Sequence, residues 1–264
     1  MAADEIPRLL RPVRALGERI VAFVTEVGGV ALLFVRALQW IPRRPFGFQL
    51  LFQQLETLGV QSLPVILLTA VFTGMVLAYQ SYQGFVRFGA ESLVGTIVAL
   101  SVVRELSPVF CGLMLSGRVG AAMAAELGTM RVTEQIDALE TLATNPIKYL
   151  VVPRLLACTM ALPILVLFAD LVGIGGGYLV STKLLGVDEG VYIQRTWQYL
   201  EWADVRMGLV KSLVFGITVA LIGCYNGFYA RGGAEGVGIA TTRAVVVSSI
   251  LVFVFDYFLT VLLL

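Results

Sequence analysis

An arginine and a glutamate stand next to each other inside a long apolar stretch of the chain. Arg104 and Glu105 lie about ten residues into the segment 93–115, which is otherwise apolar enough to lie in a membrane. Charged side chains in such segments are costly, and they usually pair with other polar groups or line a polar pathway. Because adjacent residues on a helix point about 100° apart, each of the two needs its own partner or a hydrated cavity. They can meet a charged ligand such as a phosphate, or form a structural ion network with charged residues of other segments: Asp170, Lys211 and Asp256.

The side-chain inventory excludes several other kinds of chemistry. The chain has no histidine, which rules out histidine triads, histidine proton relays and histidine-ligated metals. Cys111, Cys158 and Cys224 are far apart in apolar runs without a C-x-x-C motif, so we expect small buried hydrophobes and no metal site. No G-x-x-x-x-G-K-[ST] motif is present, so the chain itself is not expected to bind ATP by a Walker A loop. A net charge of +1 does not indicate a nucleic-acid partner.

The elements that position these residues follow from composition. Of the 264 residues, 58% are apolar and only 14% are charged, and the mean hydropathy is +0.87. A soluble domain has roughly 45–50% apolar and about 25% charged residues. So few charges cannot cover a globule in water. The composition therefore predicts an all-α integral membrane protein.

Five stretches have the roughly 20 apolar residues that a spanning helix needs. The predicted spans are about 62–82, 93–115, 149–181, 207–229 and 244–264. Pro108 removes a backbone donor in the second span and is expected to bend that helix. Small residues recur every four positions along 112–128 and 169–181, which favours close helix packing within the chain, with a dimer seam as the alternative.

The N-terminal segment 1–45 is basic and amphipathic, and the membrane domain is expected to occupy 46–264. The stretch Ile20–Ile41 is apolar, but Glu26 and Arg36 interrupt it and arginines flank it. This pattern favours a helix lying at the membrane surface, with its arginines on anionic headgroups, over a sixth span.

Basic residues in the loops predict the orientation of the chain. One arginine, Arg87, follows the first span, whereas seven precede it: Arg8, Arg11, Arg14, Arg19, Arg36, Arg43 and Arg44. With five spans, the N-terminus is expected in the cytoplasm and the C-terminus on the outer side of the membrane.

The sequence of the cytoplasmic segment Arg131–Asn145 predicts a short amphipathic helix. Its acidic residues gather in the first turns, as a helix N-terminus favours, and Ile136, Leu139 and Leu142 form an apolar stripe. The segment is too short and too charged to span. Such a helix either lies on the membrane surface or docks into a groove of a soluble partner.

The run RELSPVFCGLMLSGRVGAAMAAELGTMRVTEQIDALETLATNP (Arg104–Pro146) closely resembles the signature region of the MlaE/YrbE family. These proteins are permease subunits of ABC transporters that work with MCE-domain proteins. FTGMVLAYQSY (Phe72–Tyr82) and GIATTRAVVVSSILVFVFDYFLT (Gly238–Thr260) resemble the family's first and last spans. The resemblance covers most of the chain from about Phe48 onward.

The resemblance implies five spans, an N-terminal interfacial helix and a permease that is not itself an enzyme. It implies a homodimer in the inner membrane of a Gram-negative-type envelope, moving phospholipids between the inner and outer membranes. ATP would be bound and hydrolysed by a partner subunit, which docks on a coupling helix at about 132–144. Further expected partners are a periplasmic hexamer of MCE-domain proteins and a STAS-domain protein. Some relatives carry sterols or other lipids instead.

By this resemblance, Arg104 and Glu105 face the lipid cavity, with the arginine on the phosphate. Leu77, Phe85 and Phe88, near the outer end of the first span, would supply its apolar wall. The residues expected to contact the ATPase are Glu134, Gln135, Asp137 and Ala138. No cofactor is expected in this chain.

Two other functions remain as alternatives. An ion-coupled secondary transporter of a hydrophobic substrate would use Glu105, Asp170 or Asp256 as proton carriers, although no internal repeat of the kind found in many such carriers is visible. A lipid-modifying intramembrane enzyme has little support without histidine or a recognisable nucleophile–base pair.

Overall fold

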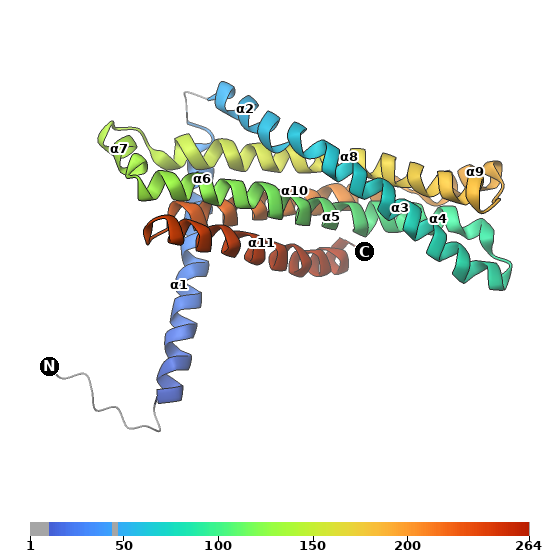
Figure 1. Cartoon of the computed structure of the whole chain (residues 1–264), viewed down its shortest axis with the longest axis horizontal. Helices are drawn as coiled ribbons and strands as arrows, with labels where there is room; N and C mark the ends of the chain where they lie inside the picture. Colours follow the sequence, from blue (N-terminus) through green and yellow to red (C-terminus); the bar gives the residue numbers. More distant parts are fainter. Residues whose placement is uncertain (1–10, 44–46, 264) are drawn as a thin grey trace.

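The computed structural model describes residues 11–43 and 47–263, with residues 11–16 described for the backbone only. All regular secondary structure in these residues is helical, and the long helices form an elongated bundle (Figure 1). Six helical stretches in the described part are long and apolar enough to cross a membrane: Gly17–Trp40, Phe48–Phe88, Glu91–Val132, Ile147–Leu184, Trp202–Phe228 and Gly233–Leu263. The prediction of an all-α integral membrane protein is confirmed. The last five stretches overlap the five predicted spans.

The described residues form α-helices of different lengths, which are separated by 3₁₀ turns, π-helical turns and loops. The α-helices are α1 (Arg11–Trp40), α2 (Phe48–Leu58), α3 (Leu63–Phe85), α4 (Val94–Ser101), α5 (Ser107–Leu115), α6 (Ala121–Val132), α7 (Gln135–Thr141), α8 (Val152–Leu179), α9 (Glu189–Tyr199), α10 (Trp202–Phe228) and α11 (Gly233–Leu263). Three 3₁₀ turns are η2 (Val60–Ser62), η3 (Val86–Phe88) and η4 (Glu91–Leu93). Four π-helical turns are η5 (Val102–Leu106), η6 (Ser116–Gly120), η7 (Ile147–Val151) and η8 (Val180–Leu184).

The second membrane helix is one continuous rod from Glu91 to Val132. At 1.5 Å per residue it is about 60 Å long, twice the roughly 30 Å of a hydrocarbon core. It therefore extends well past the predicted span and carries α7 at its far end. Pro108 lies in the first turn of α5, directly after the π-helical turn η5. Such turns change the local hydrogen-bonding pattern of a helix and often occur at functional sites.

Glycines bring α3 and α8 into direct backbone contact. A Cβ atom on Gly74 would lie only 1.9 Å from the carbonyl oxygen of Gly173, and one on Gly176 would lie 2.6 Å from that of Val71. Side chains at these positions would force the two helices apart. The small residues of 112–128 likewise face α10 and α11, where Gly112 meets Phe215. Packing within the chain therefore accounts for both ridges of small residues.

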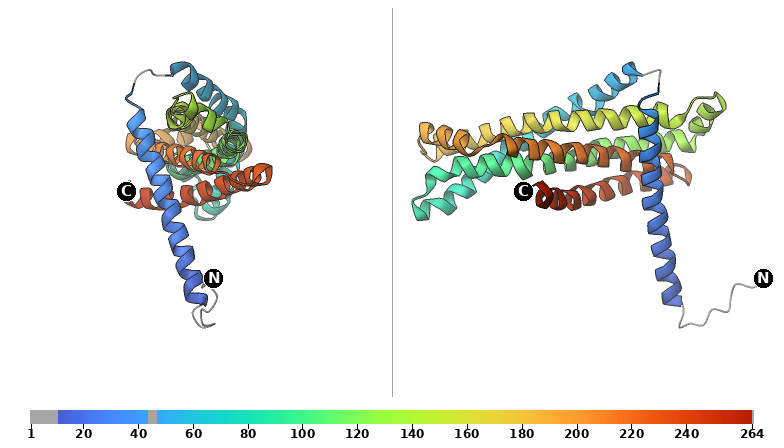
Figure 2. Two further views of the ribbon diagram at one scale, coloured as in Figure 1. Left: turned by 90° about the vertical axis from the view of Figure 1, so that its left-hand side faces the viewer. Right: turned by 180° about the vertical axis from the view of Figure 1, so that it is seen from behind.

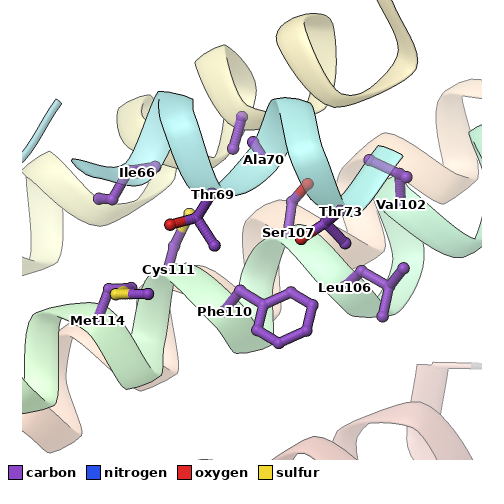
Figure 3. Close-up of a pocket in the computed structure, with 11 residues that line it drawn as sticks. Ile66, Thr69, Ala70, Thr73, Val102, Leu106, Ser107, Phe110, Cys111 and Met114 are labelled. Atoms are coloured by element: carbon purple, nitrogen blue, oxygen red, sulfur yellow. The ribbon is translucent and has the colours of Figure 1, made fainter. Parts of the chain in front are cut away.

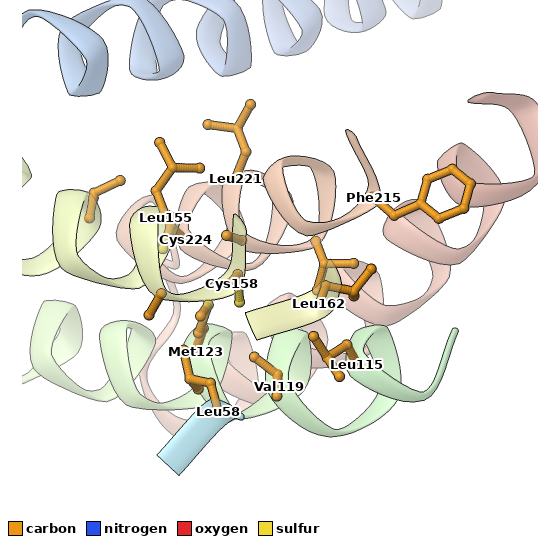
Figure 4. Close-up of a cluster of buried hydrophobic side chains, with 14 of the residues drawn as sticks. Leu58, Leu115, Val119, Met123, Leu155, Cys158, Leu162, Phe215, Leu221 and Cys224 are labelled. Atoms are coloured by element: carbon orange, nitrogen blue, oxygen red, sulfur yellow. The ribbon is translucent and has the colours of Figure 1, made fainter. Parts of the chain in front are cut away.

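The main hydrophobic core lies between α5, α6, α8 and α10 (Figure 4). Met123, Leu162 and Phe215 are among its largest fully buried side chains. The three cysteines are free and buried. The prediction that they act as small buried hydrophobes is confirmed.

Helix α1 crosses the bundle instead of running along it (Figures 1 and 2). It contacts the bundle through Leu33 and Ala37, which are fully buried, and through an ion pair of 2.5 Å between Glu26 and Arg243 of α11. Its length and composition alone would allow a sixth span. The crosswise direction is the one that a helix at the membrane surface takes when the other helices span. The predicted domain boundary at 45 and 46 lies outside the described residues.

Helix α9 lies between the third and fourth predicted spans in the sequence and caps the end of the bundle opposite α7 (Figure 1). Asp188 caps its N-terminus by accepting a hydrogen bond of 2.9 Å from the Val191 amide. Tyr192 is buried against α4 and packs edge-on to Tyr178, with ring centroids 5.6 Å apart. This burial raises the pKa of the Tyr192 phenol to about 12. The contacts fix α9 on the end of the second membrane helix.

Candidate functional site

Arg104 is held by an acidic residue at the start of α10. Its Nε and Nη2 atoms lie 2.7 and 2.5 Å from Oδ1 of Asp204. The other carboxylate oxygen of Asp204 accepts a hydrogen bond of 2.9 Å from the Glu201 amide, within a reciprocal capping box at the N-terminus of α10. The Asp204 side chain is 4% exposed and that of Arg104 is 36% exposed. The carboxylate thus fixes the guanidinium but leaves about a third of it accessible.

Glu105 pairs with Lys211, which lies on α10 like Asp204. Lys211 is completely buried, and its Nζ atom lies 2.5 Å from Glu105 and 2.9 Å from Asp256 of α11. The ammonium also donates a hydrogen bond of 3.1 Å to the Arg104 carbonyl oxygen. The Thr260 hydroxyl, one turn beyond Asp256, donates to the Asp256 carbonyl oxygen at 2.8 Å and lies 3.3 Å from a Glu105 carboxylate oxygen. One buried cation therefore joins three helices through two carboxylates.

The two halves of this ion network share one face of α10, because Asp204 and Lys211 are two helical turns apart. The expectation that Arg104 and Glu105 each need a separate partner is confirmed. Of the alternatives, the network with Lys211 and Asp256 is formed, and Asp170 is not part of it. The Oδ1 atom of Asp170 is buried without a hydrogen-bond partner among the described residues. The side chains of Arg104 and Glu105 both stay about one third exposed. Their role in binding a ligand remains a prediction.

A narrow apolar crevice lies on the other side of the same helix, between α3 and α5 (Figure 3). Val102 and Leu106, one helical turn apart, face it, whereas Arg104 and Glu105 between them contact α10 and α11. The hydroxyl groups of three residues enter its otherwise apolar lining: Thr69, Thr73 and Ser107. Its internal volume is about 20 Å³, enough for little more than one water molecule. A lipid tail fits there only if α3 and α5 move apart.

The predicted apolar wall is only partly assembled. Leu77 and Phe85 pack against a small cluster between α3 and α4 that includes Val98 and also touches Leu106. Phe88, in contrast, is 83% exposed at the end of η3. The structure therefore brings two of the three residues to the helix that carries Arg104, but it does not join them with the ion network in one open chamber.

The predicted coupling helix is present and shorter than 132–144. Helix α7 spans Gln135–Thr141 and is bracketed by Glu134 and Ala143, which adopt left-handed backbone conformations with φ of 61° and 55°. Ile136 is fully buried and anchors the helix, and Arg131 forms an ion pair of 2.5 Å with Asp137. The side chains predicted to contact a partner are all exposed: Glu134, Gln135, Asp137 and Ala138.

Asp204 is the site residue that the sequence analysis missed. The signal was available, because Glu201 and Asp204 have the spacing of a helix cap and Lys211 follows seven residues later. An acidic residue buried at the N-terminus of a membrane helix needs a cation nearby, and Arg104 was the unassigned one.

The helical bundle and the charges inside it define a multi-pass membrane protein. Comparison with known proteins identifies it further, since residues 51–262 match the protein family described as Permease MlaE. The chain belongs to this family of permeases. The resemblance of residues 104–146 to this family is thereby confirmed.

The similarity to individual relatives extends over nearly the whole chain. A probable ABC transporter permease protein of Rickettsia felis is 50% identical over 252 residues, covering 96% of this chain and 97% of the relative. The intermembrane phospholipid transport system permease protein MlaE of Haemophilus influenzae is 37% identical over 252 residues, covering 95% and 97%. The chloroplastic protein TRIGALACTOSYLDIACYLGLYCEROL 1 of Arabidopsis thaliana is 41% identical over 208 residues, covering 79% and 59%.

Proposed function

We propose that this chain is the permease subunit of an ABC transporter that moves phospholipids between the inner and outer membranes of a bacterial envelope. The observation that carries the proposal is the 37% identity, over 95% of the chain, to a permease named for intermembrane phospholipid transport. The charged and apolar surfaces along the second membrane helix suit such a substrate, whose headgroup carries a phosphate and whose tails are apolar.

ATP hydrolysis is assigned to a separate subunit. The chain carries no Walker A motif, and relatives are named as permeases of ABC transporters. The exposed polar residues of α7 offer a docking surface for that subunit, while the buried Ile136 ties the helix to the bundle. Movement of α7 would pass along the continuous helix Glu91–Val132 to the ion network and the crevice. A shift of the α5 part of that helix would then separate α5 from α3 and admit a lipid tail.

Within this scheme Arg104 contacts the lipid phosphate. Its guanidinium is already oriented by Asp204, and the exposed third of the side chain can form a charge-assisted hydrogen bond. Leu77, Phe85 and Phe88 would contact the tails when the helices separate. Glu105 holds Lys211 in its buried position beside the arginine, so that Arg104, which stays partly exposed, is the cation able to contact a phosphate.

The assembly and orientation follow the same proposal. The protein is a homodimer in the inner membrane, with the N-terminus and α7 in the cytoplasm and the C-terminus in the periplasm. A periplasmic hexamer of MCE-domain proteins receives or delivers the lipid, and a STAS-domain protein accompanies the ATPase. Helix α1 lies on the cytoplasmic surface of the membrane, in keeping with its crosswise direction (Figure 2).

The test is reconstitution of the purified complex into vesicles with labelled phospholipid. We expect an ATPase and an MCE protein to copurify, and transfer to require ATP. Transfer driven by an ion gradient without ATP would instead indicate the secondary transporter. Arg104→Gln combined with Asp204→Asn removes both charges of the pair and is expected to abolish transfer while the complex still assembles. Unchanged transfer by this double variant would remove Arg104 from the site.

A further inference from the structure

A second pocket lies at the α7 end of the bundle, away from the ion network. It is formed where the end of α1, the start of α2, the segment after α7 and the start of α8 meet, and its volume is about 560 Å³. This is far larger than the crevice between α3 and α5. Its wall is apolar along α2 and α8, where Leu51, Val152 and Leu156 line it.

Two cations converge on one aromatic ring in this pocket. The guanidinium of Arg43 lies 4.5 Å from the centroid of the Trp40 ring, and the ammonium of Lys148 lies 5.8 Å from the same centroid. The ring thus positions both charges at the pocket wall. Among the described residues that line the pocket, none is acidic. The pocket is therefore a site of positive charge on an apolar base.

The surroundings place the pocket at the level of a membrane surface. Trp40 and Tyr149 both line it, and these residue types gather where hydrocarbon meets water. Phe48 and Phe52, at the start of α2, are 62% and 67% exposed, as expected for side chains that face lipid tails. A molecule bound here would have its polar end at the two cations and its apolar part along α2.

We propose that this pocket binds the headgroup of an anionic phospholipid of the surrounding leaflet, separate from the transported lipid. The phosphate contacts Arg43 and Lys148, and the acyl chains run along the exposed side of α2. Basic pockets between membrane helices on the cytoplasmic side recognise anionic headgroups in this way. The cytoplasmic placement rests on the orientation given under the proposed function. A lipid is favoured over a free phosphate because the pocket wall is continuous with the apolar surface of α2.

The bound lipid would also touch the coupling region. Ala143 and Asn145, which close the segment after α7, line the pocket, and Asn145 accepts a hydrogen bond of 3.1 Å from the Lys148 amide. Ala143 holds a left-handed conformation that an L-residue rarely adopts. A headgroup seated against this segment would stabilise the position of α7. Anionic lipid is thus expected to favour docking of the ATPase subunit.

The test compares lipid retention in two charge-matched double variants of the full chain with its partner subunits. Arg43→Gln with Lys148→Gln removes the pocket cations. Lys183→Gln with Arg195→Gln removes two cations at the opposite end of the bundle, where Arg195 also lies near an aromatic ring. Native mass spectrometry would count phosphatidylglycerol bound during a titration. The pocket variant is expected to bind about thirtyfold more weakly, equivalent to about 2 kcal/mol for two basic residues, and the control is expected to match the wild type.

Equal retention by both variants would overturn the proposal, as would equal binding of phosphatidylcholine. Displacement of the lipid by inorganic phosphate at millimolar concentration would replace it with a free-anion site. Arg43→Lys with Lys148→Arg keeps both charges and should restore retention, which separates charge loss from misfolding. Phosphatidylglycerol binding together with absent ATP-driven transfer would overturn the proposed function but leave this pocket intact.

Discussion

Substitution of Lys211 is expected to separate the structural from the functional role of the ion network. Lys211→Met leaves Glu105 and Asp256 facing one another without the ammonium that now lies 2.5 and 2.9 Å from them. It also removes the hydrogen bond to the Arg104 carbonyl oxygen. Removing one partner of a buried ion pair destabilises a protein by about 3–5 kcal/mol. Because Glu105 is 37% exposed and can be rehydrated, we expect the lower end of that range.

A matched variant removes the charge without leaving it unbalanced. Lys211→Met combined with Glu105→Gln and Asp256→Asn is neutral at all three positions, and replacing a whole buried ionic group is often nearly neutral for stability. For a chain of this size, a loss of about 3 kcal/mol corresponds to a melting temperature lower by about 10 °C. The triple variant is expected within about 3 °C of the wild type.

The assay is thermal unfolding of the purified protein in one detergent, followed by lipid transfer at a temperature where each variant is folded. The expected cost of an unpaired charge is refuted if Lys211→Met has the melting temperature of the wild type. It is also refuted if the melting temperature of the triple variant is as low as that of Lys211→Met. If the triple variant is stable but transfers no lipid, the charges of the network act in transport. If it is stable and transfers lipid normally, Glu105 serves the fold alone.

Three further predictions test other parts of the molecule. Gly74→Ala places a Cβ against the Gly173 carbonyl and should destabilise the protein by about 1–3 kcal/mol, whereas Gly175→Ala, with no atom within 4 Å, should be neutral or stabilising by up to about 1 kcal/mol; equal melting temperatures would contradict the α3–α8 contact. Asp137→Arg on α7 should weaken ATPase binding by about thirtyfold in a pull-down titration, since a central contact is worth about 2 kcal/mol, while Gln198→Arg on α9 should not change it. Thr141→Cys and Glu189→Cys should be labelled by an impermeant maleimide from opposite sides of the membrane. The buried Cys111, Cys158 and Cys224 are not expected to react. Labelling of both introduced cysteines from the same side would refute the proposed orientation.

The spans could be predicted because their signal is local. Twenty apolar residues in a row need no knowledge of their neighbours, and the five predicted spans overlap five helical stretches. Helix ends were harder to predict, since a charged residue lowers the local hydropathy but does not end a helix. Helix α11 begins at Gly233, eleven residues before the predicted span, and its Arg243 forms an ion pair with Glu26 of α1. That pairing joins residues 217 positions apart, and no local pattern reveals it.

The site could be predicted only as far as its own segment. The sequence showed that Arg104 and Glu105 needed separate partners, and helix geometry made that inference secure. It also supplied Lys211 and Asp256 as candidates. It could not choose among the candidates, because the choice depends on which faces of α10 and α11 meet the second membrane helix. The predicted wall of Leu77, Phe85 and Phe88 assumed an open cavity, whereas the structure has α3 packed closely against α5.

The closed crevice and the long second helix together suggest where a conformational change must occur. Arg104 and Arg131 are on one continuous helix, about 40 Å apart at 1.5 Å per residue. A straight α-helix would transmit any tilt at α7 rigidly to the ion network and break its ion pairs. The π-helical turns η5 and η6 interrupt the regular hydrogen-bonding pattern between these points. Bending at the end of η5, just before α5, would let α5 leave α3 while the segment that carries Arg104 stays joined to Asp204. Cross-linking across the junction of η5 and α5 should therefore block transport without changing ATPase docking, whereas free transport in the cross-linked protein would place the moving element elsewhere.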